Sequence, residues 1–97
     1  MNELDSIIHQ PVRLRIMGAL CGLAPTDQVD FGFLKEKLDL TDGNLGAHLS
    51  TLEESGYIKV EKTFVGKRPK TFLNVTKAGR RAFDSHVAAL RAILAGK

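Results

Sequence analysis

The 97-residue sequence contains a single cysteine, Cys21, and no long run of apolar residues. One thiol excludes an internal disulfide and a metal site built from several thiolates, and it is typical of a reducing compartment. No apolar stretch approaches the ~20 residues that span a bilayer. The start, MNELDSIIHQPV, is acidic where a secretory signal is basic and lacks its apolar region. We therefore expect a cytoplasmic protein without a membrane span.

The sequence also lacks the patterns of common enzymes. It has no Gly-rich phosphate loop and no Ser/His/Asp arrangement, and its three histidines, His9, His48 and His86, fall on separate predicted elements. We expect no catalysis, no cofactor and no bound metal. Hydrophobic residues make up 43% of the chain and charged residues 26%, which is ordinary for a globular protein. Because no repeat or linker divides the chain, residues 1–97 are predicted to form a single domain.

The charge that is present is unevenly distributed. The net charge is +3, but residues 59–81 hold eight basic residues against one acidic residue, Glu61, so the rest of the chain is acidic. Such a block is either a solvated face or a surface that binds polyanions, and its position relative to the helices has to decide. The basic residues are Lys59, Lys62, Lys67, Arg68, Lys70, Lys77, Arg80 and Arg81.

Two helices are predicted in the first part of the chain. A short one is expected around Leu4, Ile7 and Ile8. Pro11 suits the first turn of the next, because its missing N–H has no helical partner there. Apolar residues wrap most of that helix, which is expected to run to about Leu23 and to be buried at the centre. The following stretch, GLAPTDQVDF, reads as a loop with a short extended piece at about 29–31.

The stretch TDGNLGAHLSTLEESGYI, residues 41–58, predicts the second helix of a helix-turn-helix that spans about 32–56. Its first helix is expected from about Gly32 to Asp39, with a tight turn after it. Thr41 suits the N-cap of the second helix, which covers about 42–55, and Gly56 suits a left-handed C-cap. Leu45, Leu49 and Leu52, at i, i+4 and i+7, form its buried stripe.

The side of this helix opposite the leucine stripe is small and nearly uncharged. At 100° per residue, Gly43, Ala47 and Ser50 lie almost opposite the stripe, and other small or polar residues flank them. Glycine costs a helix ~1 kcal/mol relative to alanine, so two glycines favour close approach to DNA over an ordinary surface helix, the alternative. The predicted DNA contacts of this helix are Thr41, Asp42, Gly43, Asn44, Gly46, Ala47, His48, Ser50 and Thr51.

His48 lies beside the leucine stripe and admits three interpretations. Its ring is half-buried and hydrogen-bonded, or it contacts a phosphate or a base, or it is a metal ligand. The sequence favours the first two, because no other histidine or cysteine lies at ligand spacing.

A β-hairpin is predicted over residues 57–75. The strands YIKVEKTF and TFLNV flank VGKRPK, whose glycine and proline suit a turn. A helix-turn-helix followed by such a hairpin makes a winged helix-turn-helix, in which the second helix enters the major groove and the hairpin reaches the flanking backbone. Lys67, Arg68 and Lys70 are therefore predicted to contact phosphates or the minor groove.

The last helix is predicted from Thr76 to about Ala95, and it carries two apolar stripes. Either it sits in a groove of its own chain, or it is shared with a second subunit, the interpretation we favour. The residues predicted at a dimer interface are Leu4, Ile7, Ile8, Phe83, Val87, Leu90, Ile93 and Leu94. The predicted fold is thus mainly α with a small β-hairpin: a three-helix core, a wing and a C-terminal dimerisation helix.

Three segments carry a family resemblance. Thr41 through Tyr57 resembles the recognition segment Thr-Asp-Gly-Asn-Leu-x-x-His-Leu-x-x-Leu-Glu-x-x-Gly-Tyr of small winged-helix regulators related to the MarR and ArsR groups. LNVTKAGRRAF is similar to their post-wing pattern, and HQPVRLRIMGAL to their first core helix. The resemblance implies a homodimer, paired through terminal helices, that binds a roughly palindromic DNA operator and regulates transcription.

The chain also departs from the resembled groups. The cysteine pair of ArsR-type metal sensors is absent, and only Asp84 and His86 match half of their alternative helical site, so no metal sensing is expected. We expect a dimeric, sequence-specific DNA-binding regulator, acting as a repressor, with no effector identifiable from the sequence. The alternative is a winged-helix module that binds a protein partner through the same surface without sequence-specific DNA binding.

Overall fold

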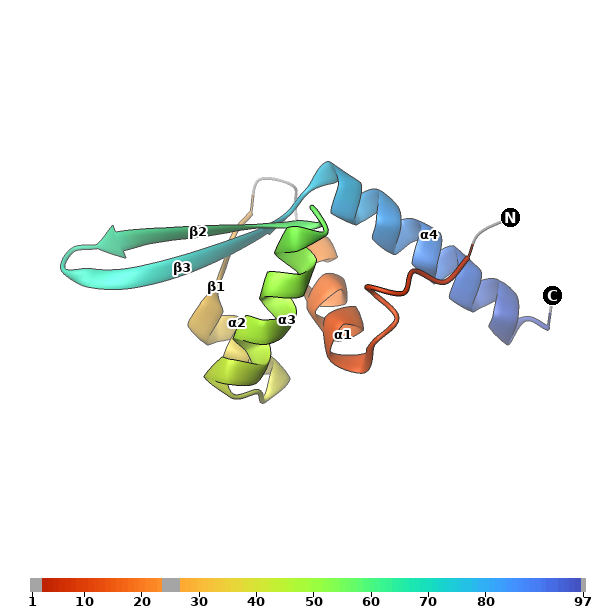
Figure 1. Cartoon of the computed structure of the whole chain (residues 1–97), viewed down its shortest axis with the longest axis horizontal. Coiled ribbons are helices and arrows are strands. Elements are labelled where there is room, and N and C mark those ends of the chain that lie inside the picture. Colours follow the sequence, from red (N-terminus) through yellow and green to blue (C-terminus); the bar gives the residue numbers. More distant parts are fainter. Residues whose placement is uncertain (1–2, 24–26, 97) are drawn as a thin grey trace.

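The computed structural model describes residues 3–23 and 27–96, which form an elongated molecule measuring 53 × 25 × 21 Å. A hairpin projects from one side of a group of three helices, and the last helix extends to the other side (Figure 1). The predicted mainly α fold with a small β-hairpin is confirmed. In chain order the elements are α1 (Pro11–Cys21), β1 (Val29–Asp30), α2 (Phe31–Leu38), α3 (Asp42–Glu54), β2 (Ile58–Val65), β3 (Arg68–Val75) and α4 (Lys77–Leu94).

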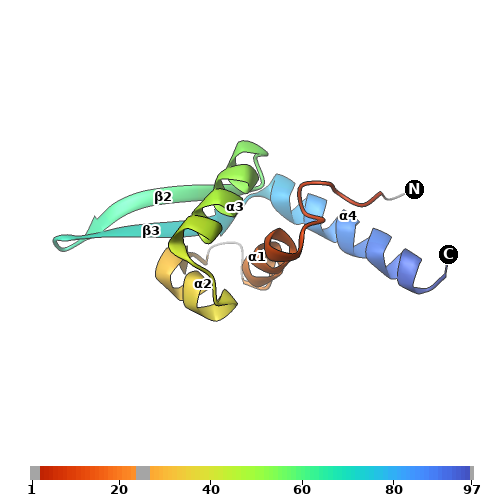
Figure 2. The same cartoon turned by 60° about the horizontal axis from the view of Figure 1, so that its bottom comes forward.

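The core lies where α1, α2 and α3 meet the base of the hairpin. Aliphatic side chains from each helix and from β3 are fully or almost fully buried there, which provides most of the favourable free energy of folding. Figure 2 shows α1, α2 and α3 grouped between the hairpin and α4. The largest buried apolar side chains are Ile8, Ile16, Met17, Leu20, Leu34, Leu45, Leu52 and Leu73.

The predicted leucine stripe of α3 points inward. Leu45 and Leu52 are fully buried and Leu49 is 4% exposed. The Thr41 hydroxyl accepts a hydrogen bond from the Asn44 N–H at 3.1 Å, so the predicted N-cap forms. Asp39 adopts a left-handed conformation with φ 55°, which ends α2 and lets α3 begin three residues later. The stripe and the cap together fix which side of α3 remains outside.

β3 is longer than the sequence predicted, and β2 has the predicted length but begins and ends one residue later. They pair in an antiparallel register from Ile58 opposite Val75 to Val65 opposite Arg68, so only Gly66 and Lys67 form the turn. β1 adds a third strand on the far side of β3, at the extended piece predicted near residue 29. Residues 58–75 are called the wing below. The segment from Arg68 to Lys70, expected in a turn, therefore belongs to a strand with alternating faces.

The short helix expected around Leu4, Ile7 and Ile8 does not form. The Asp5 carboxylate accepts hydrogen bonds from the N–H groups of Ile7 and Ile8, at 2.8 and 3.1 Å, and holds residues 6–8 in a turn instead. Aspartate often competes with helical backbone bonding in this way.

The central helix also ends earlier than expected. α1 stops at Cys21 with Gly22 as its C-cap, two residues before Leu23. The Arg80 guanidinium of α4 donates hydrogen bonds to the carbonyls of Cys21 and Leu23, at 3.1 and 2.7 Å, and satisfies this helix end. Residues 24–26 of the predicted loop lie outside the described residues.

The start of α4 is packed directly on the base of the wing. The Thr76 hydroxyl accepts from the Gly79 N–H at 2.9 Å, as a cap should. A Cβ at Gly79 would overlap the Tyr57 carbonyl oxygen and would lie 2.9 Å from Val75 Cγ2. Only glycine fits here, because the contact is with backbone that cannot move aside. None of the described helices combines the length and apolarity needed to cross a membrane.

Candidate nucleic-acid interface

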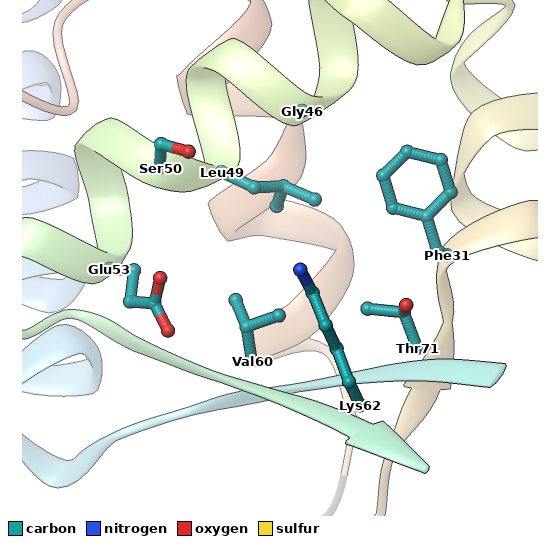
Figure 3. A pocket seen from close by; sticks show the side chains of 8 residues that line it. All are labelled: Phe31, Gly46, Leu49, Ser50, Glu53, Val60, Lys62 and Thr71. Atoms are coloured by element: carbon teal, nitrogen blue, oxygen red, sulfur yellow. The ribbon is translucent and has the colours of Figure 1, made fainter. Parts of the chain in front are cut away.

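A cleft opens between one flank of α3 and the wing (Figure 3). From α3 it is lined by Gly46, Leu49, Ser50 and Glu53, and from the other side by Val60, Lys62, Thr71 and Phe31. Lys62 extends from β2 toward this flank of α3, where Gly46 and Ser50 are small and Glu53 is acidic. The predicted recognition helix and the wing therefore face the same space.

The small side of α3 has room in front of it. Gly43, Ala47 and Ser50 are exposed, and a Cβ built at Gly43 or Gly46 would meet no atom within 4 Å. The fold therefore does not require glycine at either position. Two poor helix formers in one short helix are instead expected where a ligand approaches the backbone closely.

Several predicted contact residues are partly engaged within the chain. Thr41 acts as the N-cap, and Asp42 forms an ion pair with Lys35 of α2 at 2.9 Å. Thr51 donates back to the Ala47 carbonyl at 3.3 Å. Asn44 is exposed beside the glycines. Of the polar groups predicted on α3, Asn44 and Ser50 are the best placed to meet a ligand.

His48 is half-buried and turned toward α1. Its Nδ1 lies 3.1 Å from Arg13 Nη1, which can only donate, so Nδ1 accepts and the ring proton sits on Nε2. Arg13 also donates through Nε to the Ile7 carbonyl, which links α1, α3 and the N-terminal segment. This contact supports the first of the three interpretations of His48, and no cluster of three metal-ligating side chains occurs within residues 3–23 and 27–96.

The predicted cations of the wing have different surroundings. Lys67 lies in the exposed turn and Arg68 in the exposed start of β3. Lys70 forms an ion pair with Asp30 of β1 at 3.2 Å, with its side chain 40% exposed, so it is a weaker candidate for a phosphate contact. The register also places Arg68 and Lys70 on the face of the wing opposite to that of Lys62.

Sequence reasoning missed Lys62 as a site residue. It shares a strand face with the buried Ile58, and that face lines the cleft opposite α3. The signal was present in the sequence, because strict alternation from Ile58 and Val60 continues to Lys62 and Phe64. The basic residues near the turn drew the prediction to residues 67–70 instead.

The residues predicted at a dimer interface divide into two groups. Ile8 is fully buried in its own core, so its assignment to an interface is wrong, and Ile7 and Phe83 also pack against that core. Ile93 and Leu94 are 55% and 84% exposed near the end of α4. Leu4, Val87 and Leu90 are partly exposed. Among the residues predicted at the interface, the most exposed therefore lie at the end of α4, which extends away from the hairpin (Figure 1).

A buried histidine holds the N-terminal segment against α4. His86 is fully buried, and its Nδ1 accepts from the Asp5 N–H at 2.9 Å. The ring lies 5.4 Å from that of His9, and no described residue accepts a hydrogen bond from its Nε2. Burial lowers the pKa of His86, and the neighbouring His9 lowers it further, against an opposing effect of Asp5. The neutral ring is therefore the form that fits this site.

Asp5 connects this histidine to the base of the wing. The Tyr57 hydroxyl donates to Asp5 Oδ2, and this bond, with burial, raises the pKa of Tyr57 to about 12. Burial by itself raises the pKa of Asp5, but hydrogen bonds from Tyr57 and the backbone outweigh it and lower the pKa overall.

The helix-turn-helix, the wing and the cleft between them define a winged helix-turn-helix protein, and comparisons with known proteins agree. The sequence model of the family described as winged helix DNA-binding domain matches residues 12–94. An uncharacterized protein of Methanocaldococcus jannaschii is 42% identical over 81 residues, covering 84% of this chain and 85% of the relative.

Solved structures show the same fold. The transcriptional regulator homologue protein of Pyrococcus horikoshii matches with a TM-score of 0.82 and 34% identity, over 93% of this chain and 86% of that one. FabT of Streptococcus pneumoniae, solved in complex with DNA, matches with a TM-score of 0.60 and 23% identity, over 86% of this chain and 57% of FabT. This chain belongs to the family of winged helix DNA-binding domains, and the predicted resemblance to small winged-helix transcriptional regulators is confirmed.

Proposed function

We propose that the protein is a dimeric, sequence-specific DNA-binding regulator that acts as a repressor by occupying its operator. The observation that carries the proposal is the open side of α3, where the fold requires neither Gly43 nor Gly46, and where Gly46 lines the same cleft as Lys62 of the wing. Glycine and alanine permit the helix to lie deep in a major groove, where Asn44 and Ser50 reach base edges or phosphates. Lys62 and Lys67 then supply the sequence-independent attraction to phosphates.

The dimer is proposed from the other end of the molecule. Ile93 and Leu94 expose apolar surface on a helix end that projects beyond the core, and a second α4 related by a two-fold axis would cover it. Such a dimer presents two copies of α3 to one duplex. Its operator is then a pseudo-palindrome with half-sites about one helical turn, ~34 Å, apart. Chromosomal binding of this kind fits the cytoplasmic location expected from the sequence.

Selection of bound duplexes from a random 30-bp library tests the proposal. We expect enrichment of one pseudo-palindromic site, bound at nanomolar affinity with a steep salt dependence, as a complex of two chains per duplex. Mass measurement by analytical ultracentrifugation gives that ratio. A library that shows no enriched sequence, with binding only to an added protein partner, would instead establish the protein-interaction module. The outer side of α3, with Gly43, Ala47 and Ser50, offers few anchors for such a partner.

A further inference from the structure

The wing carries a large apolar side chain that the core leaves exposed on the side of the cleft. Phe64 is 70% exposed, although it lies within β2 and pairs with Pro69 of β3. Side chains alternate along a strand, so Ile58, Val60, Lys62 and Phe64 share one face. That face is buried at Ile58 and lines the cleft at Val60 and Lys62. Phe64 continues the same face outward.

The direction of this face is fixed by α3. Val60, Lys62 and Thr71 line the cleft opposite Gly46 and Ser50 (Figure 3). Phe64 lies two residues beyond Lys62, or about 7 Å farther toward the turn. A duplex that rests against α3 and is flanked by the wing therefore meets the Phe64 ring close to the wing's end.

The basic residues around Phe64 indicate which class of ligand this part of the wing binds. Residues 62–70, KTFVGKRPK, contain four basic residues and no acidic one. An apolar ring among cations fits a ligand with anionic edges and apolar walls. The minor groove of DNA has this form, with phosphates along its rims and sugar and base surfaces inside. An anionic membrane combines the same features, but the continuity of the Phe64 face with the side of α3 favours DNA.

Resting on the proposed function, we infer that Phe64, backed by Pro69, packs against the sugar and base surfaces of the minor groove that flanks each half-site. Lys67, in the turn, binds a phosphate along that groove. Such a contact makes no base-edge hydrogen bond. It favours flanks whose base steps open or bend readily, so it adds specificity through DNA shape outside the sequence that α3 contacts.

The neighbouring Val65 supplies a matched control for this inference. It is 56% exposed and adjacent to Phe64, but it lies on the opposite face of β2. With the duplex recovered from the random library, we expect Phe64→Ser to lower the affinity at least tenfold and to leave the slope of log Kd against log salt unchanged. Val65→Ser should stay within twofold of the wild type. Equal melting temperatures of both variants without DNA confirm that the fold is intact.

A fluorescence experiment locates the ring directly, because the chain contains no tryptophan. We expect the emission of Phe64→Trp to change on addition of the selected duplex and to become protected from acrylamide quenching. The emission of Val65→Trp should change little. Vesicles of phosphatidylcholine with phosphatidylserine should leave both emissions unchanged.

The outcomes separate this inference from the proposed function. If the wild type binds the selected duplex and Phe64→Ser binds equally well, the minor-groove contact is wrong and the DNA-binding function stands. Similar losses for Phe64→Ser and Val65→Ser overturn the assignment of the face. A wild type that enriches no duplex overturns both proposals. A Phe64→Trp signal with vesicles and none with DNA assigns the wing's end to a lipid surface and overturns the inference.

Discussion

Packing requires glycine on one side of this molecule and does not require it on the other. On the α4 side, comprising the start of α4 with the residues packed on it, a Cβ at Gly79 would overlap the Tyr57 carbonyl. On the cleft side, comprising the outer side of α3 and the wing face that lines the cleft, a Cβ at Gly43 or Gly46 would meet open space. Packing therefore explains Gly79, whereas Gly43 and Gly46 are explained by the proposed DNA contact. Substitutions on the α4 side should therefore change stability, and those on the cleft side should change DNA binding.

The largest effect is expected from Gly79→Ala. The added methyl group cannot avoid the backbone of Tyr57, so we expect the free energy of unfolding to fall by about 3 kcal/mol, as in strongly overpacked sites. Urea denaturation followed by circular dichroism measures it. Gly18→Ala in α1 is the control, because its Cβ would lie 3.8 Å from Phe83 Cζ, an ordinary contact. Equal stability of both variants would remove the distinction between the two sides.

A large effect on binding alone is expected from the double substitution Lys62→Ala and Lys67→Ala. Removing two phosphate contacts per wing should weaken binding to the selected duplex about a hundredfold and lower the salt slope by about two per wing. Titration at several salt concentrations by fluorescence anisotropy gives both numbers. Lys70→Ala, whose cation is already paired with Asp30, should lower the slope less. A double variant with the wild-type slope would mean that the wing does not meet phosphates.

Acid should act on the α4 side through His86. The pKa of His86 is lowered by burial, so the folded state binds fewer protons than the unfolded state between that lowered value and the ordinary value of 6.5. The stabilisation is complete above pH 6.5 and is lost as the pH falls through this window. The lowered pKa of Asp5 acts in a separate range, below its ordinary value of 3.8.

Thermal unfolding from pH 7.5 to 5 tests this dependence. His86→Asn retains an acceptor near the Asp5 N–H and has no titrating ring, so the slope of stability against pH should flatten. His9→Asn leaves the buried ring in place and should keep most of the slope. An unchanged slope in His86→Asn would assign the pH dependence to another group.

Local features of the fold could be predicted from the sequence because they depend on neighbouring residues. The leucine stripe of α3, the Thr41 cap and the glycines opposite the stripe are all fixed within a few turns of one helix. The hairpin was predictable for the same reason, although its strands extend farther toward the turn than the proline at position 69 suggested.

Features that depend on distant residues could not be predicted in the same way. Arg80 belongs to the basic block, yet it caps α1 some 57 positions away, at the Leu23 carbonyl. Asp5 replaces an expected helix with a turn because it also contacts Tyr57 and His86. The basic block therefore overstated the DNA-facing charge, since Arg80 and Lys70 have partners within the chain.

Gly46→Ala adds a single methyl group, which is the smallest chemical change among these tests. It tests the central claim that the small side of α3 lies against DNA. The free protein should become more stable by about 1 kcal/mol, because alanine is the better helix former and its Cβ meets nothing within 4 Å. Binding to the selected duplex should nevertheless weaken at least tenfold, because the methyl group stands between the helix and the groove. A variant that is more stable and binds DNA as tightly as the wild type would contradict the account.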